Sequence, residues 1–301
     1  MNVPDRLAPL FVIFAASLWG IDGIILRPSL YGLPVSLVVL VESSIVVILL
    51  TPFFIRKYPE IKSLNYRDWL AFIGIALFGG AIGTMAITKA LFYVNFVNLS
   101  IVVLIQKLQP VFAFILAALL LQERLPFRFF AWSCVAIFGA YLMTFGFTLP
   151  NINTGTQTIS AALFALLAAF SFGTSTVLSK RALRNVSFQL GTYLRFLVTT
   201  IIMVIIVTSF CLLSELDKIT SKQLMVFLLI AFSTGGLATF FYYYGLKKIS
   251  ASLSAICELA FPLTAVILEY LVRSNILGIV QWGGVFLLLI SIFKVMNLKL
   301  K

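Results

Sequence analysis

The chain has 301 residues, of which 61% are hydrophobic and only 11% are charged, and it contains no histidine. A soluble domain of this length is close to half apolar and about a quarter charged, so the composition excludes a water-soluble fold and predicts a polytopic membrane protein. The missing histidine excludes Ser-His-Asp triads, Cys-His pairs and histidine zinc helices. The sequence also lacks a phosphate-binding loop with its lysine, so we expect neither an enzyme nor a bound cofactor or metal ion.

Apolar runs separated by charges or prolines predict ten membrane-spanning helices, a number that about 21 residues per crossing allows. The first run is not expected to be a cleaved signal peptide, because it continues through Trp19-Gly20 without a small-residue cleavage site. The spans are expected at residues 9–27, 35–55, 69–88, 94–121, 127–147, 160–179, 189–211, 223–244, 250–271 and 279–296.

Most lysines and arginines outside these spans fall on one side of the predicted membrane. By the positive-inside rule, both termini are expected in the cytoplasm, and the compact loops favour a prokaryotic inner membrane. The net charge of +12 then lies against an anionic leaflet, which makes nucleic acid an unnecessary partner. The expected partners are the lipid bilayer and a small-molecule solute.

Five landmarks recur in the same order in the two halves of the chain. Each half has five spans, and because five is odd, the second copy must enter the membrane from the opposite face. Inverted repeats of this kind are typical of secondary transporters. We expect a first repeat at 1–148, a connecting loop at 149–159 and a second repeat at 160–301. The landmark pairs are Trp19-Gly20 with Phe172-Gly173, Gly79-Gly80 with Gly235-Gly236, Ala90-Leu91 with Gly245-Leu246, Pro110 with Pro262, and Trp132 with Trp282.

Three motifs resemble the EamA branch of the drug/metabolite transporter superfamily: Ala16-Ser17-Leu18-Trp19-Gly20 in span 1, Gln106-Lys107-Leu108-Gln109-Pro110 in span 4, and Leu119-Leu120-Leu121-Gln122-Glu123-Arg124-Leu125 at its end. The resemblance covers the whole chain. It implies an all-α fold of ten transmembrane helices in two inverted five-helix repeats, a central cavity, and solute export or exchange. The second half departs from the pattern, with Val272-Arg273-Ser274-Asn275 where the glutamate motif would stand.

Two prolines predict helix breaks at equivalent depths in spans 4 and 9. Proline lacks the N–H that would bond the carbonyl four residues earlier, so Pro110 is expected to free the carbonyl of Gln106 and Pro262 that of Glu258. Each half then presents an open backbone acceptor beside a polar side chain, which points to a solute site in a wet cavity. The alternative is a kink that only shapes the helix around a neighbour.

Glu42 and Arg195 occupy equivalent positions in spans 2 and 7, each about 10 Å into its span. Charges inside a membrane usually face a cavity or a partner. One interpretation makes Glu42 a cation- or proton-binding carboxylate and Arg195 an anion clamp, which together suit a zwitterionic solute. The alternative is a structural or gating ion pair without ligand contact.

Other side chains complete the candidate solute site. Lys107 is expected either to be neutralised by Glu258 or Glu42 or to bind a carboxylate on the solute, and Gln109 and Trp19 are further candidates for solute contact. Because no histidine is present, Glu258 and Glu42 are the candidate proton-coupling residues.

Three further segments are given structural interpretations. Asp22 lies near a predicted span end, so contact with water is expected there. The run Phe240-Phe241-Tyr242-Tyr243-Tyr244 precedes two lysines and predicts an aromatic belt at the membrane interface. The paired glycines Gly79-Gly80 and Gly235-Gly236 are expected to permit close helix crossings.

These features predict a secondary active or facilitative transporter, an exporter or exchanger, that moves a small polar or amphipathic metabolite such as an amino acid by alternating access. Alternatives are a proton-coupled drug transporter or a nucleoside or nucleotide-sugar type transporter. An intramembrane lipid enzyme lacks a supporting motif, and a receptor or scaffold lacks loops long enough to present a partner surface.

Overall fold

The computed structural model describes residues 5–54, 58–62, 64–93, 100–149, 157–273 and 278–298. Within them, ten helices are long and apolar enough to cross a membrane, as the composition predicts. Their bounds differ from the predicted ones by a few residues at most ends. The spans are Ala8–Leu30, Val35–Phe54, Tyr66–Ala90, Leu104–Leu121, Phe127–Phe145, Ile159–Ala182, Phe188–Ser209, Ser221–Lys248, Ala251–Leu268 and Ile279–Met296.

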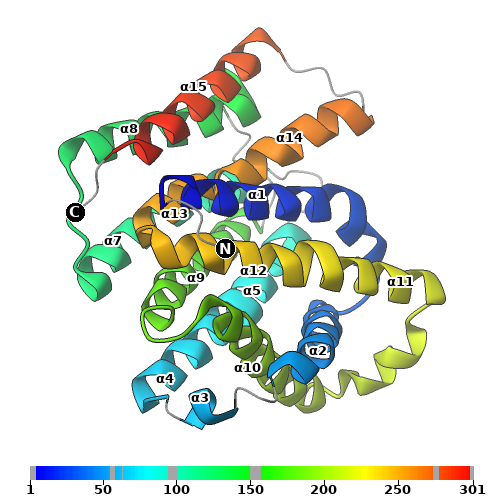
Figure 1. The fold of residues 1–301 in the computed structure, drawn as a ribbon. Coiled ribbons are helices and arrows are strands. Elements are labelled where there is room, and N and C mark those ends of the chain that lie inside the picture. The colour runs from blue at the N-terminus through cyan, green and yellow to red at the C-terminus, as the bar shows by residue number, and fades with distance from the viewer. Residues whose placement is uncertain are drawn as a thin grey trace.

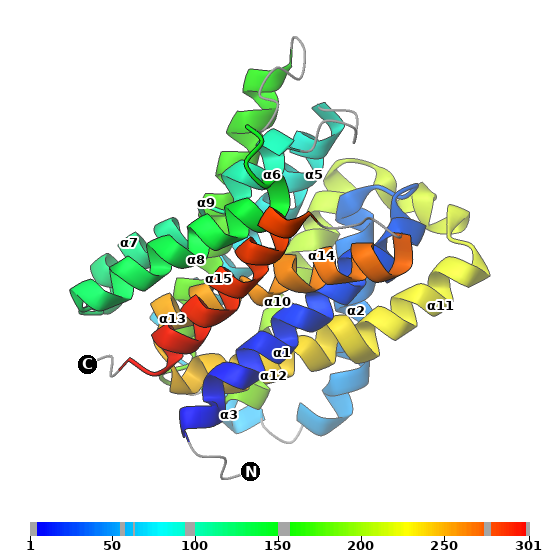
Figure 2. The same cartoon turned by 90° about the horizontal axis from the view of Figure 1, so that it is seen from above.

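Several spans consist of more than one helical segment (Figures 1 and 2). The first half contains α1 (Ala8–Ile21), α2 (Val35–Phe54), α3 (Tyr58–Lys62), α4 (Tyr66–Ile75), α5 (Gly83–Tyr93), α6 (Ser100–Gln106), α7 (Gln109–Leu121) and α8 (Phe127–Phe145). The second half contains α9 (Thr158–Ala182), α10 (Phe188–Ser209), α11 (Ser221–Ile230), α12 (Gly236–Lys248), α13 (Ala251–Cys257), α14 (Ala260–Arg273) and α15 (Ile279–Met296).

Helix ends follow the sequence where a polar residue precedes an apolar run. Thr220 and Gln223 form a reciprocal capping box at the start of α11, with bonds of 3.0 and 3.3 Å between each backbone N–H and the partner side chain. Ser187 and Ser250 cap α10 and α13 by accepting the N–H three residues on. At the other end of a span, Gln122 ends α7 with a left-handed backbone at φ 57°.

Wide π-helical turns occur at equivalent places in the two halves. The turn Ala76–Ile82 joins α4 to α5, and Ala231–Gly235 joins α11 to α12, so each paired-glycine landmark lies in or beside such a turn. The expected close crossing is present at Gly80, where an added Cβ would lie 2.9 Å from Thr199 of α10. Turns of this type are rare and often lie near functional sites, and nothing in the glycine pattern predicted them.

The main helix contacts join the two halves and not the helices within one half. Figures 1 and 2 show α1 alongside α12, and α8 alongside α15 at the edge of the bundle. Two related copies with opposite orientations are expected to pack in this way, with helices of one copy contacting helices of the other. The pairs are α1 with α12 and α14, α2 with α10, α5 and α7 with α9, and α8 with α15.

The crossing of α8 and α15 brings backbone within contact of backbone. An added Cβ on Gly284 would meet the backbone nitrogen of Met143 and lie 2.7 Å from the carbonyl oxygen of Gly139. Backbone atoms cannot move aside as a flexible side chain can, so the two helices would have to separate. The same small-residue contact is a common packing device between membrane helices.

Replacing Gly284 by alanine is therefore expected to lower the free energy of unfolding by about 1–3 kcal/mol, the usual cost of overpacking. Thermal unfolding of the purified protein in detergent measures the change. Gly283→Ala is a matched control, because nothing lies within 4 Å of its added Cβ. Equal unfolding temperatures for the two variants would show that α8 and α15 leave room for a methyl group at Gly284.

Candidate functional site

Span 9 is interrupted between α13 and α14, and Glu258 lies at the interruption. The N–H of Glu258 still bonds the carbonyl of Ser254 at 2.8 Å, as in a continuous helix. The carbonyl of Glu258 accepts the N–H of Phe261 at 3.0 Å. The prediction of an open backbone acceptor at Glu258 is therefore wrong: a tighter turn takes up the carbonyl that Pro262 leaves without its usual partner.

Span 4 is interrupted at the equivalent place, between Gln106 and Gln109. The N–H of Lys107 bonds the carbonyl of Leu104 at 3.2 Å, so the chain tightens here too. Pro110 is buried in the first turn of α7, a position where its missing N–H costs no hydrogen bond. Both repeats thus change helix just before their matched prolines, as Pro110 and Pro262 predict.

Four neutral side chains donate hydrogen bonds to the carboxylate of Glu258. Gln109 Nε2 lies 2.9 Å from Oε2, and the hydroxyl of Tyr242 lies 2.7 Å from Oε1. The hydroxyls of Thr176 and Ser254 are each 3.2 Å from Oε1. We call these five residues the Glu258 cluster. They come from α7, α9, α12, α13 and the α13–α14 break itself, so the cluster joins the two broken spans.

Aromatic rings and one cation border the Glu258 cluster. The ring of Trp19, on α1, is 5.1 Å from that of Tyr242 between centroids. Arg195, on α10, places its guanidinium carbon 5.7 Å from the centroid of Tyr243, a cation–π distance. That guanidinium forms no hydrogen bond or ion pair with any described residue, yet it is close enough to attract the carboxylate of Glu258.

The tyrosines of this site correct a prediction. Tyr242 is 3% exposed and Tyr243 is fully buried, with its hydroxyl 3.0 Å from Ser179 Oγ. The run 240–244 is therefore not a belt at the membrane interface. The hydroxyls of Tyr242 and Tyr243 have hydrogen-bond partners inside the bundle, so neither needs water at the membrane surface.

Lys107 is buried, with 6% of its surface exposed. Its ammonium group makes no hydrogen bond or ion pair with another described residue. Neither Glu258 nor Glu42 neutralises the charge of Lys107, contrary to the prediction. Glu258 instead accepts hydrogen bonds from neutral side chains, and Glu42 forms an ion pair with Arg27. Gln106 is half-buried and takes no part in the hydrogen bonds of the Glu258 cluster; Gln109, three residues on, does so instead.

Glu42 belongs to a separate group of charges. Arg27 lies between two carboxylates, 2.6 Å from Oδ2 of Asp22 and 3.3 Å from Oε1 of Glu42. Arg195, the predicted anion clamp, lies over Tyr243 and does not belong to this group of charges. The structure thus gives Glu42 the ion pair that was the alternative interpretation.

Asp22 is 4% exposed, so the expectation of contact with water is wrong. The reason is the length of the first span, which continues to Leu30 through a π-helical turn at Asp22–Leu26 and a 3-10 turn at Arg27–Leu30. Arg27 was predicted to end the span. It lies inside it instead, and neutralises the buried carboxylate.

Glu123, the acidic residue of the family motif, links the two halves at another point. Its carboxylate accepts the backbone N–H groups of Ala251 at 2.7 Å and Ser252 at 3.2 Å, and the hydroxyl of Ser252 at 2.7 Å. These are free N–H groups of the first turn of α13, where a negative charge is favoured. Sequence reasoning missed this role, because the two segments are more than 100 residues apart in the chain.

Ten apolar helices in two halves, with equivalent breaks beside a buried polar cluster, are the features of a membrane transporter built from repeats. The chain belongs to the EamA-like transporter family, whose model matches residues 6–145 and 159–297. The match to each half separately supports two repeats. The exact division at 149–159 stays a prediction, and residues 150–156 lie outside the described part of the chain.

Two curated relatives are similar over most of the chain. The riboflavin transporter ImpX of Fusobacterium nucleatum subsp. nucleatum is 43% identical over 96% of this chain and 97% of its own. An uncharacterized transporter of Synechocystis sp. is 27% identical over 80% of this chain and 69% of its own. One solved crystal structure has the same fold, with a TM-score of 0.74 at 16% identity and 96% coverage of both chains.

The family, the ten spans and the bacterial relatives make this chain a multi-pass inner-membrane protein and a metabolite transporter. The cytoplasmic location of both termini stays a prediction.

Proposed function

We propose that this chain transports riboflavin, or a flavin of the same class, by alternating access, with the Glu258 cluster as the solute site. The observation that carries the proposal is the meeting of an aromatic pair and a hydrogen-bonding cluster at the two broken spans. The relative named a riboflavin transporter, at 43% identity, directs the choice of solute.

The chemistry of the cluster fits a flavin. An isoalloxazine ring is flat and aromatic, and it stacks well on a tryptophan or tyrosine ring such as the Trp19–Tyr242 pair. Its imide edge offers both donors and acceptors, which the amide of Gln109 and the carboxylate of Glu258 complement. The hydroxyls of Thr176 and Ser254 suit the polyol chain.

In this proposal the cluster's internal hydrogen bonds are exchanged for bonds to the solute. A bound flavin takes donors from Gln109 and Tyr242 that now point to Glu258, so the free and loaded site each satisfy their buried polar groups. Helix α7 and the α13–α14 break belong to different halves. Movement of one half against the other therefore changes the contacts of a solute that is bound between them.

Transport of riboflavin into and out of proteoliposomes tests the proposal, and flavin fluorescence reports the flux in both directions. A panel of amino acids and nucleosides, offered to the same protein as stabilising ligands in thermal unfolding, tests the other solute classes. We expect saturable riboflavin flux and a rise in unfolding temperature with riboflavin. An amino acid that stabilises and moves while riboflavin does neither would refute the assignment.

Trp19→Ala is expected to raise the KM for riboflavin about tenfold, within the range measured for stacking a base on an aromatic side chain. Trp19→Phe keeps a ring and should lose less. The comparison variant is Trp282→Ala, which removes a tryptophan from α15, outside the cluster. Initial rates in proteoliposomes give KM and maximal flux separately. An unchanged KM in Trp19→Ala would place the flavin elsewhere.

A further inference from the structure

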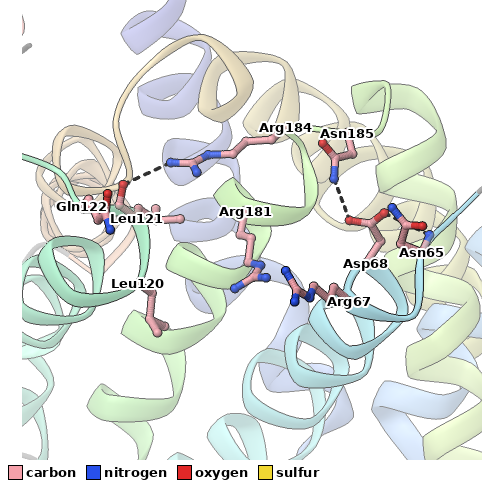
Figure 3. Close-up of a pocket in the computed structure, with 9 residues that line it drawn as sticks. All are labelled: Asn65, Arg67, Asp68, Leu120, Leu121, Gln122, Arg181, Arg184 and Asn185. Atoms are coloured by element: carbon pink, nitrogen blue, oxygen red, sulfur yellow. Dashed lines mark hydrogen bonds between the residues drawn. The ribbon is translucent and has the colours of Figure 1, made fainter.

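A polar pocket of about 500 Å³ lies where α4 begins and where α7 and α9 end (Figure 3). Its volume is in the range of small-molecule sites. All three helix ends are ends of membrane spans, so the pocket lies at one face of the bilayer and apart from the Glu258 cluster. We call it the basic pocket; it is lined by Asn65, Arg67, Asp68, Leu120, Leu121, Gln122, Arg181, Arg184 and Asn185.

The basic pocket holds three arginines and one carboxylate. Asp68 is already occupied, because its oxygens accept the N–H of Asn65 at 3.2 Å and the amide of Asn185 at 3.0 Å. Arg184 donates to the carbonyl of Leu121 at 3.2 Å. The pocket therefore keeps an excess of positive charge, and none of its arginines forms an ion pair with a described residue.

Arg181 and Arg67 are the residues that most need a ligand. Figure 3 shows their guanidinium groups pointing toward each other across the pocket. Arg181 is half-buried, and its guanidinium makes no hydrogen bond with another described residue, while Arg67 donates only to its neighbour Tyr66 at 3.1 Å. Two like charges that face each other repel unless an anion lies between them.

We propose that the basic pocket binds a phosphate group between Arg67 and Arg181. Guanidinium forks match the oxygens of phosphate in paired hydrogen bonds, and a phosphate group presents more oxygens to two facing forks than a single carboxylate does. The side-chain amides of Asn65 and Gln122 supply further donors around the same space. The phosphate comes either from a free phosphate or phosphate ester, or from the headgroup of an anionic lipid.

A bound phosphate would connect the two halves of the transporter. Arg67 begins the third span of the first half, and Arg181 lies at the end of the sixth span, in the second half. Two direct links already cross between the halves here, from Arg184 to Leu121 and from Asn185 to Asp68. The phosphate adds a charged bridge beside them and holds this face of the protein together.

The first experiment uses the full chain in a neutral detergent, with inorganic phosphate and pyrophosphate titrated against chloride at constant ionic strength. A ligand that binds the folded state raises the unfolding temperature with concentration. Arg181→Gln is expected to weaken the apparent affinity about tenfold or more, since it removes a charge-assisted fork. Arg128→Gln, an exposed arginine on α8 outside the pocket, should leave it unchanged.

The second experiment distinguishes the two sources of phosphate. The wild-type protein, Arg181→Gln and Arg67→Gln are compared in vesicles of phosphatidylcholine alone and with phosphatidylglycerol. Stabilisation by phosphatidylglycerol that depends on both arginines assigns a lipid headgroup, and stabilisation by soluble phosphates alone assigns a free phosphate. Equal responses of wild type and both variants to every probe would overturn the proposal. No arm depends on riboflavin transport, so the result is independent of the proposed solute.

Discussion

Glu258→Gln is expected to lower riboflavin flux at least about tenfold, because hydrogen bonds to a charged group are among the strongest in a site. Both carboxylate oxygens now accept bonds, from Gln109 on one side and from Tyr242, Thr176 and Ser254 on the other. A glutamine replaces one acceptor with an NH2 group, which faces donors and leaves them unpaired. Initial flux in proteoliposomes measures the loss.

The matched control is Glu215→Gln, which makes the same change at a surface carboxylate paired with Lys218 at 2.6 Å. Exposed pairs of this kind contribute little, so its flux should stay close to that of the wild type. The double variant Glu258→Gln with Glu42→Gln tests both candidate carboxylates together. Full activity of the double variant would exclude both of these carboxylates from the transport mechanism.

The same variant also tests proton coupling. If Glu258 carries the coupling proton, wild-type flux responds to an imposed pH gradient and the flux of Glu258→Gln does not. If the gradient still drives the variant, the proton binds elsewhere, and Glu42 is the next carboxylate to replace. A wild-type flux that ignores the gradient identifies a facilitator or an exchanger, which needs no titrating residue.

Arg27→Gln is expected to lower the free energy of unfolding by about 2–3 kcal/mol. The change leaves Asp22 and Glu42 as buried carboxylates without their cation, and breaking a fully buried pair costs about 3–5 kcal/mol. The lower figure reflects the 33% exposure of the Arg27 side chain, which lets water screen part of the charge. Thermal unfolding in detergent measures the difference.

A compensating change makes this second prediction specific. Combining Arg27→Gln with Asp22→Asn removes one carboxylate along with the cation, so much of the lost stability should return. Arg128→Gln loses an arginine at an exposed position and should unfold like the wild type. If the double variant is no more stable than Arg27→Gln alone, the stability at this point comes from packing and not from charge.

The ten spans and both helix breaks could be predicted because each depends on local chemistry. An apolar run long enough to cross the bilayer must satisfy its backbone within itself, so span positions follow from composition. Pro110 and Pro262 each lack the N–H that a continuous helix would bond to the preceding turn, so a break just before each proline follows from the residue itself. The same local rule failed for the carbonyl of Glu258, because a tighter turn can satisfy a carbonyl that proline leaves open.

Which side chains meet inside the bundle could not be predicted in the same way. Lipid and the bundle interior are both apolar, so hydrophobic periodicity does not tell the buried face of a span from its lipid face. Tyr242 and Tyr243 were therefore placed at the interface, although they lie beside Glu258 and Arg195. Glu42 was matched with Arg195 by repeat position, whereas its cation is Arg27, which was predicted to be the last residue of the first span.

The exchange of contacts between the halves has a consequence for how the chain is made. During synthesis the first five spans enter the membrane before the helices that they pack against have been made. In the finished protein α2 packs against α10, α5 against α9, and α8 against α15. Until the second half is inserted, polar groups such as Glu123 have no helix end to bind. The early chain must therefore be sheltered by lipid or by the insertion machinery, and assembly is completed only when the last span arrives.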